Sequence, residues 1–150
     1  MKNHLILFIS FLFLFISSCK DDEEKLACPM ILLPMTVNVT YVDENGEDLL
    51  FGDNPTYSTT DIDIYLVENE EQISLKFTVN EGSRFITIDV PQAKDGTFLI
   101  ELEPNEADEI TYRAEVNEDD YCKNLMVTKL KQNDNEVFYN VKRQVWELVK

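Results

Sequence analysis

The chain has 150 residues, of which 29 are acidic and 13 basic, so its formal net charge is −16 at neutral pH. A surface this acidic repels phosphate backbones and anionic lipid headgroups, which argues against nucleic acid as a partner and against electrostatic binding to a membrane. Apolar residues make up 44% of the chain. That share is enough for a packed core, so the length predicts one folded domain plus a targeting segment.

The N-terminus carries a basic start and then a short apolar run, residues 5–16. This run is too short to cross a bilayer core, which needs about 20 residues in a helix. A basic start, a short apolar run and small residues after it are typical of a signal peptide, so residues 1–18 are expected to be removed. Because the only histidine, His4, lies in this segment, the remaining chain would lack histidine-dependent catalytic and metal sites. We therefore expect neither a cofactor nor an enzyme.

Residues 16–19 read Ile-Ser-Ser-Cys, an aliphatic residue and two small ones before a cysteine. This order resembles the lipobox of bacterial lipoproteins. The resemblance implies cleavage between Ser18 and Cys19, a diacylglyceryl thioether on Cys19 and acylation of the new amino terminus. Two or three acyl chains hold a protein stably at a membrane, at about 0.8 kcal/mol per buried methylene. The expected organisation is a signal peptide (1–18), a lipidated acidic tether (19–34) and a folded domain (35–150).

A lysine and four acids follow the cysteine: Lys20, Asp21, Asp22, Glu23 and Glu24. They resemble the export signal of surface-exposed lipoproteins of the Bacteroidota. The resemblance implies an outer-membrane lipoprotein that faces the cell exterior, and a charged tether of a lipoprotein facing the periplasm is the alternative. Clustered like charges repel one another, so the tether is expected to be flexible.

From residue 35 onward, short runs of alternating apolar and polar residues recur with turn signals between them. Such runs are typical of antiparallel sheets with one wet face, and their number and spacing predict a single antiparallel β-sandwich of about 7–9 strands. In chain order, the residues expected to point inward are Met35, Val37, Val39, Tyr41, Ile62, Ile64, Leu66, Ile73, Leu75, Phe77, Val79, Ile86, Ile88, Val90, Phe98, Ile100, Leu102, Ile110, Tyr112, Ala114 and Val116.

Asn45-Gly46 is a strong signal for a hairpin near the start of this domain. The surrounding segment, residues 42–50, and the general layout resemble small immunoglobulin-like or transthyretin-like lipoproteins of the Bacteroidota, which implies an immunoglobulin-like sandwich. Residues 141–150 fit either a last strand, with Val141, Val145 and Val149 on one face, or a short helix. The strand is favoured because a closing edge strand completes a sandwich.

Cys28 and Cys122 remain as a pair once Cys19 is lipidated. An exported chain meets oxidising conditions, so the pair predicts a disulfide, with two separate thiols as the alternative. In the chain-entropy model a bond across so long a loop stabilises the fold by up to about 4.7 kcal/mol.

Four residues of the hairpin, Asp43, Asn45, Glu47 and Asp48, offer hard oxygen ligands for calcium. The EF-hand pattern fails, because glycine stands at the fourth place and no glutamate at the twelfth. A hairpin turn explains the same residues, so the calcium site is the weaker interpretation and no metal is expected.

Trp146 with Tyr57, Tyr121 and Tyr139 would be a candidate platform for stacking sugars, although burial in a core is the commoner fate of such rings. The leading hypothesis is a non-enzymatic, membrane-anchored module for binding or assembly, with an envelope protein complex or a glycan as partner. A carbohydrate-binding accessory lipoprotein is the first alternative. A hydrolase that uses a carboxylate pair such as Asp61 and Asp63 is the second.

Overall fold

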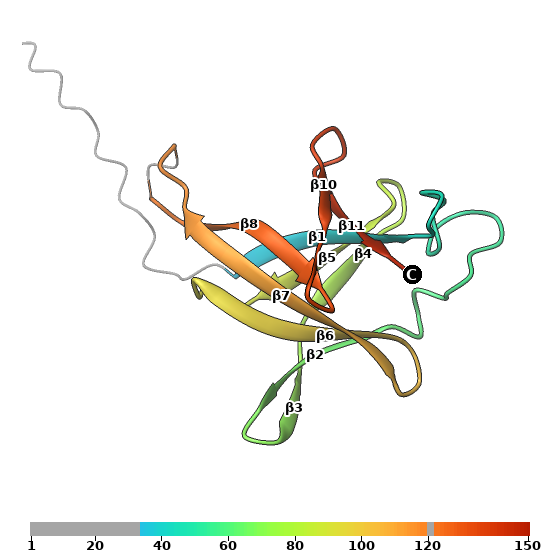
Figure 1. Ribbon diagram of the computed structural model, residues 1–150, viewed down its shortest axis with the longest axis horizontal. Coiled ribbons are helices and arrows are strands. Elements are labelled where there is room, and N and C mark those ends of the chain that lie inside the picture. Colours follow the sequence, from blue (N-terminus) through green and yellow to red (C-terminus); the bar gives the residue numbers. More distant parts are fainter. Residues whose placement is uncertain (1–33, 120–121) are drawn as a thin grey trace, which may run out of the picture.

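The computed structural model describes residues 34–119 and 122–150. Within these residues all regular structure is β, and eleven strands form two sheets that pack on each other (Figure 1). No helix in the described ranges is long and apolar enough to cross a membrane. The predicted all-β sandwich is confirmed. It has more strands than expected, partly because two segments of the chain each contribute one strand to one sheet and the next strand to the other.

The five-stranded sheet, called sheet A, has the order β10-β11-β1-β5-β4, and the six-stranded sheet, called sheet B, has the order β3-β2-β6-β7-β8-β9. Sheet A contains β1 (Met35–Val42), β4 (Phe77–Asn80), β5 (Phe85–Val90), β10 (Phe138–Asn140) and β11 (Val145–Val149). Sheet B contains β2 (Asp63–Glu68), β3 (Glu71–Ser74), β6 (Asp95–Glu103), β7 (Glu106–Val116), β8 (Leu125–Gln132) and β9 (Asn135–Glu136).

One neighbouring pair departs from the antiparallel expectation. β1 and β11 run parallel, with Val39 opposite Trp146 and Tyr41 opposite Leu148. Parallel neighbours need a long crossover connection. Here nearly the whole domain is that crossover, so no local sequence pattern could indicate it.

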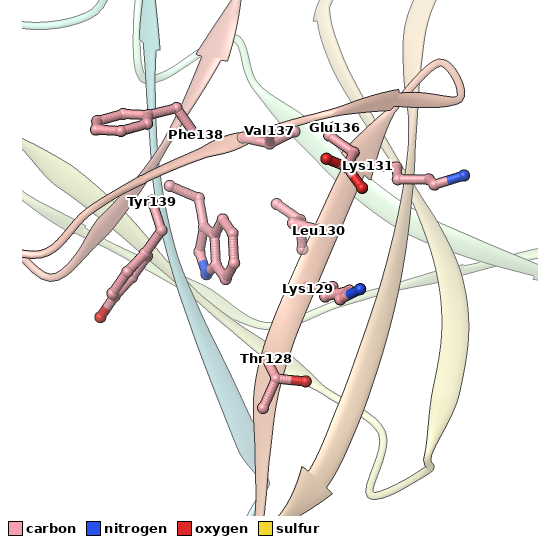
Figure 2. Close-up of a pocket in the computed structure, with 9 residues that line it drawn as sticks. Thr128, Lys129, Leu130, Lys131, Glu136, Val137, Phe138 and Tyr139 are labelled. Carbon is pink, nitrogen blue, oxygen red and sulfur yellow. The ribbon is translucent and has the colours of Figure 1, made fainter.

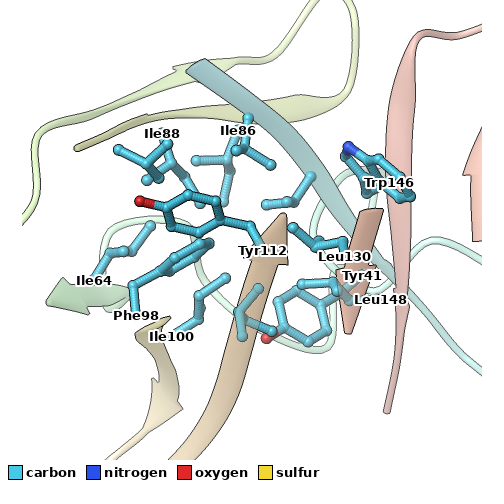
Figure 3. Packing of buried hydrophobic residues seen from close by; sticks show 14 of the residues in the cluster. Tyr41, Ile64, Ile86, Ile88, Phe98, Ile100, Tyr112, Leu130, Trp146 and Leu148 are labelled. Carbon is cyan, nitrogen blue, oxygen red and sulfur yellow. The ribbon is translucent and has the colours of Figure 1, made fainter. Parts of the chain in front are cut away.

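The core lies between the two sheets and takes alternate residues from the long strands. Most of the positions predicted to point inward are buried there, among them Val37, Val39, Tyr41, Ile64, Ile86, Ile88, Phe98, Ile100, Ile110 and Tyr112 (Figure 3). The part of the core nearest β11 also contains Leu130, Trp146 and Leu148. Period-2 alternation was therefore a reliable guide wherever a strand stays in one sheet.

The chain crosses from sheet B to sheet A between β3 and β4. The N–H of Leu75 still donates to the carbonyl of Ile64 in sheet B, at 2.8 Å. The carbonyl of the next residue, Lys76, already accepts from the N–H of Asp89 in sheet A, at 2.9 Å. One extended segment thus supplies an edge strand to both sheets.

Because of this crossing, the prediction that Ile73 points inward together with Leu75, Phe77 and Val79 is wrong. Ile73 is 44% exposed at the edge of sheet B, whereas Phe77 and Val79 pack against the core from sheet A. A bend between sheets changes which side chains face inward, and alternation alone does not reveal it. Val116 is also exposed rather than buried, because β7 extends past the core at that end.

A second crossing joins β9 to β10 on the opposite side of the sandwich. The N–H of Val137 donates to the carbonyl of Leu130 in sheet B, at 3.1 Å. The next residue, Phe138, pairs with Glu147 in sheet A. The two sheets are therefore connected on both sides by strands that leave one sheet and enter the other.

The Asn45-Gly46 signal marks a tight turn rather than a full hairpin. The N–H of Gly46, whose φ is +83°, donates to the carbonyl of Asp43 at 2.9 Å. The returning chain makes only one bridge, between Val42 and Asp48. Beyond it an irregular segment places Leu50 and other side chains in the core.

The closing segment is a strand, as favoured, and not a helix. The inward residues differ from those expected: Val141 lies exposed in a turn, and Val149 is also exposed. Val145 is buried, while Trp146 and Leu148 belong to the core cluster.

Gly96 in β6 provides a test of the core packing. It pairs with Tyr112 of β7, and a Cβ at Gly96 would lie 2.5–2.7 Å from atoms of the Tyr112 ring. That ring is buried and its O–H donates to the carbonyl of Pro91 at 3.0 Å, so it cannot move freely. We expect Gly96→Ala to lower the free energy of unfolding by about 1–3 kcal/mol in urea denaturation.

Gly82→Ala is the matched control, because a Cβ at Gly82 meets nothing within 4 Å. It should change stability by less than about 0.5 kcal/mol. Equal effects of the two substitutions would contradict the packing described for Tyr112.

Candidate functional site

A groove of about 360 Å³ opens beside the second crossing, between the edge of sheet B and the edge of sheet A. It is lined mainly by apolar and aromatic side chains. The lining residues are Thr128, Lys129, Leu130 and Lys131 of β8, Glu136 and Val137 at the crossing, Phe138 and Tyr139 of β10, and Trp146 of β11 (Figure 2).

Strand alternation decides which side chains of β8 face the groove. Leu130 is buried and points toward it, whereas Lys129 and Lys131 point the opposite way along its rim (Figure 2). The bulge in the pairing of β7 with β8 sets this register. The groove therefore has an apolar interior with a basic rim on one side.

Two aromatic rings lie side by side in the lining of the groove. Tyr139 lies directly opposite Trp146 in the pairing of β10 with β11, and such partners share a face of the sheet. Their ring centroids are 4.7 Å apart and the planes are inclined by 49°. Trp146 is 9% exposed and Tyr139 38%, while Phe138 on the neighbouring position is 65% exposed. The rings offer edges and part of one face rather than a flat platform.

The groove lies in the only strongly basic part of the sequence. Residues 123–150 carry the acids Asp134, Glu136 and Glu147 against the basic residues Lys123, Lys129, Lys131, Lys142, Arg143 and Lys150, and the other 26 acids precede residue 123. Among the residues described, neither Lys129 nor Lys131 lies within ion-pair distance of a carboxylate. This asymmetry along the sequence was the signal that could have indicated the site.

A titratable cluster at the end of the sandwich is a second place to examine. The buried carboxylate of Asp108 accepts from the O–H of Tyr41 at 2.9 Å and from Nδ2 of Asn133 at 2.8 Å. Nζ of Lys150 lies 3.5 Å from the same carboxylate and 3.2 Å from that of Glu106. These contacts tie β1 of sheet A to β7 of sheet B.

Burial and the contacts with Asp108 and Glu106 shift the pKa values of two groups in this cluster. Burial raises the pKa of Tyr41 well above its usual range, and the charge of Asp108 and its hydrogen bond raise it further. Burial alone would lower the pKa of Lys150, but attraction to Asp108 and contact with Glu106 outweigh it, so the pKa is raised. Each of these groups has a partner within the cluster, so we assign the cluster a structural role.

The carboxylates of two of the four calcium candidates, Asp43 and Asp48, are engaged in hydrogen bonds and an ion pair. Oδ1 of Asp43 accepts from the N–H groups of Asn45 and Glu47 at 2.9 and 2.7 Å. The bonds from Glu47 and Asn45 lower the pKa of Asp43. Oδ1 of Asp48 accepts from two backbone N–H groups, and Oδ2 pairs with Arg84 at 3.4 Å. No group of three or more potential metal-ligating acid, cysteine or histidine side chains occurs in residues 34–119 and 122–150.

The structure does not bring the predicted aromatic set together. Tyr57 lies in the irregular segment after the first turn, partly buried against the core, and lines a different pocket of about 290 Å³. That pocket also contains Asp61 and Asp63, which are exposed and so lack the desolvated environment that a catalytic acid needs. Of the three platform residues that the structure describes, only Trp146 and Tyr139 are in contact with each other.

Several predicted residues lie outside the described ranges. These are the lipidation site Cys19, the export signal from Lys20 to Glu24, Cys28 and Tyr121. The disulfide between Cys28 and Cys122 therefore stays a prediction.

The chain matches no protein-family model, and neither a curated protein nor a solved structure is similar enough to match it. The proposal for function therefore rests on the side chains that line the groove.

The Tyr41–Asp108 contact predicts how stability changes in alkali. A raised pKa means that folded Tyr41 keeps its proton at a pH where the unfolded chain, with a tyrosine pKa of about 10, loses it. Its contribution is therefore complete below about pH 10 and is lost as the pH rises above that value, and the raised pKa of Lys150 acts in the same direction. The free energy of unfolding should fall as the pH rises above about 10.

Tyr41→Phe should be less stable by about 1–3 kcal/mol near neutral pH, because a buried acceptor loses a donor. Its stability should then decline less steeply in alkali than that of the wild type, measured by urea denaturation across the pH series. Parallel declines for the two proteins would contradict the role given to this pair.

Proposed function

We propose that the chain is an outer-membrane lipoprotein, anchored through Cys19 and displayed at the cell exterior, whose β-sandwich is a non-enzymatic binding module. The groove beside β8 and β10 is its ligand site. The single observation that carries the binding role is the contact of Tyr139 with Trp146 inside an open, mainly apolar groove. Aromatic residues in partly desolvated pockets are the usual anchors of binding energy.

The chemistry of the lining favours binding over catalysis. Its charged side chains are Lys129, Lys131 and Glu136, and both lysines point away from the interior (Figure 2). No nucleophile and base are brought together there, whereas apolar side chains form a surface from which a ligand can displace water.

The shape of the groove favours a polypeptide over a sugar. A sugar ring stacks on an exposed, flat aromatic face. Trp146 is largely buried and is inclined to Tyr139, so little of a flat face is offered. Apolar side chains of a partner would fit the space between these rings and Leu130.

A disulfide would connect the lipid-anchored tether to the strand that borders the groove. Cys122 stands three residues before β8 begins at Leu125. A bond from Cys122 to Cys28 would hold the membrane tether close to β8, and would stabilise the domain against unfolding in the oxidising envelope. The charged tether would then give the domain limited freedom to meet a partner.

The anchor is tested by metabolic labelling with a fatty acid in a bacterium that makes lipoproteins. Cys19→Ala should abolish the label, because it removes the thiol that carries the lipid, while Cys28→Ala should keep it. Replacing residues 20–24 by neutral residues should leave the label and reduce cleavage by protease added to intact cells. A label retained by Cys19→Ala would overturn the anchor, and unchanged cleavage would overturn display at the exterior.

The groove is tested by retention of solubilised envelope material on vesicles that carry the full chain. Phe138→Ser and Tyr139→Ser should each weaken retention about tenfold or more, as expected for aromatic anchors. Ile73→Ser is the matched control, because Ile73 is an exposed apolar residue on an edge strand at the other crossing. Equal losses in all three variants, or none in the first two, would contradict the proposed site.

A further inference from the structure

One edge of β8 is paired along only part of its length. On one side β7 pairs with β8 from Leu125 to Gln132. On the other side β9 pairs with Lys131 and Gln132 alone, and Val137 adds one bond to Leu130. Within residues 34–119 and 122–150, no strand lies beside positions 125–129. Such an edge presents backbone N–H and C=O groups to an incoming strand.

The side chains along this edge point to an apolar and a polar side, and the bulge between Val127 and Lys129 interrupts their alternation. Leu125 and Val127 pack against the core, and Leu130 faces the groove. Met126 and Lys129 are exposed on the outer face. A strand added here would place alternate side chains against the same two environments, because side chains of neighbouring strands share faces.

Two basic side chains are neighbours on the outer face beside this edge. Lys129 lies directly opposite Arg113 of β7, and like charges opposite each other are unfavourable. Acids also occur on this face, because Asp95 of β6 lies opposite Arg113 on its other side and Glu115 lies opposite Met126. In the part of the chain that the structure describes, neither Lys129 nor Arg113 forms an ion pair. Acidic side chains on an added strand would lie beside Lys129 and relieve this repulsion.

We propose that the ligand of the groove is an extended polypeptide segment in which acidic and apolar residues alternate, and which adds as a strand to the edge of β8 at residues 125–129. Its apolar side chains enter the groove toward Leu130, Tyr139 and Trp146. Its acidic side chains lie over Lys129 on the outer face. About five residues, or about 16 Å of strand, fit before β9 blocks the edge. This inference rests on the proposed function, since it names the ligand of the same groove.

The chain contains its own reporter for the test, because Trp146 is the only tryptophan and lies in the groove. The full chain in detergent micelles is titrated with an eight-residue peptide that alternates glutamate with leucine, and Trp146 emission is followed. We expect a saturable change. Lysine in place of glutamate should weaken binding at least tenfold, because like charges then meet Lys129. Methylation of alternate backbone nitrogens should do the same, because it removes the donors that a ladder needs.

Two charge variants separate the edge from the general surface. Lys129→Glu should weaken binding of the acidic peptide at least tenfold. Lys76→Glu makes the same change in charge at the other crossing and should bind as the wild type does, since Lys76 is exposed far along the sheet order from β8.

Four results would overturn the inference. They are equal binding of the lysine peptide, equal binding of the methylated peptide, equal losses in the two charge variants, and a change in Trp146 emission with protein concentration alone, which would indicate a second copy of the chain as occupant. If the acidic peptide has no effect while Phe138→Ser still loses envelope material, the ligand is of another kind and the binding groove stands. If Phe138→Ser retains that material, the proposed function itself fails.

Discussion

The structure depends on one constraint: at each side of the sandwich, a single segment must serve an edge of both sheets. Leu75 makes the last bond to sheet B and Lys76 the first to sheet A. Val137 and Phe138 repeat this exchange on the opposite side. The two crossings hold the sheets together at their edges, and the core between them fills the space that the crossings define. Because a crossing strand leaves one sheet before it enters the other, it cannot cover the whole edge of either.

The groove is a consequence of that geometry. β9 leaves sheet B after pairing with Lys131 and Gln132, so the first half of β8 keeps an open edge among the described residues. β10 then carries Tyr139 to a position over Trp146, which gives the opening an aromatic wall. The other crossing brings no comparable pair of rings together in the described ranges, and its exposed Ile73 stands beside acidic neighbours. Aromatic side chains and basic residues thus occur together at one of the two crossings.

Local patterns in the sequence were sufficient for the fold class and for most of the core. β5 and β6 follow strict alternation, and the inward residues of β1, β5 and β6 are buried as predicted, although the second half of β1 is buried on both faces. The failures share a cause, because they all depend on contacts distant in sequence: the bend at Leu75, the parallel pairing of Val39 with Trp146, and the meeting of Tyr139 with Trp146. Trp146 was a candidate, but as part of a flat platform with Tyr57, which lies in a different pocket. The basic character of residues 123–150 was visible in the sequence and, combined with the aromatic residues there, would have indicated the groove.

The central claim is that the edge of β8 is open and receives a strand. Hydrogen–deuterium exchange of backbone amides in the full chain, with and without the alternating acidic peptide, tests it most directly. The account predicts fast exchange in the free protein at those amides of residues 125–129 that point away from β7, and slow exchange in β1 and β5. The peptide should bring new protection to these outward amides and to β10 alone. Slow exchange of the outward amides before the peptide is added, or protection located elsewhere, would contradict it.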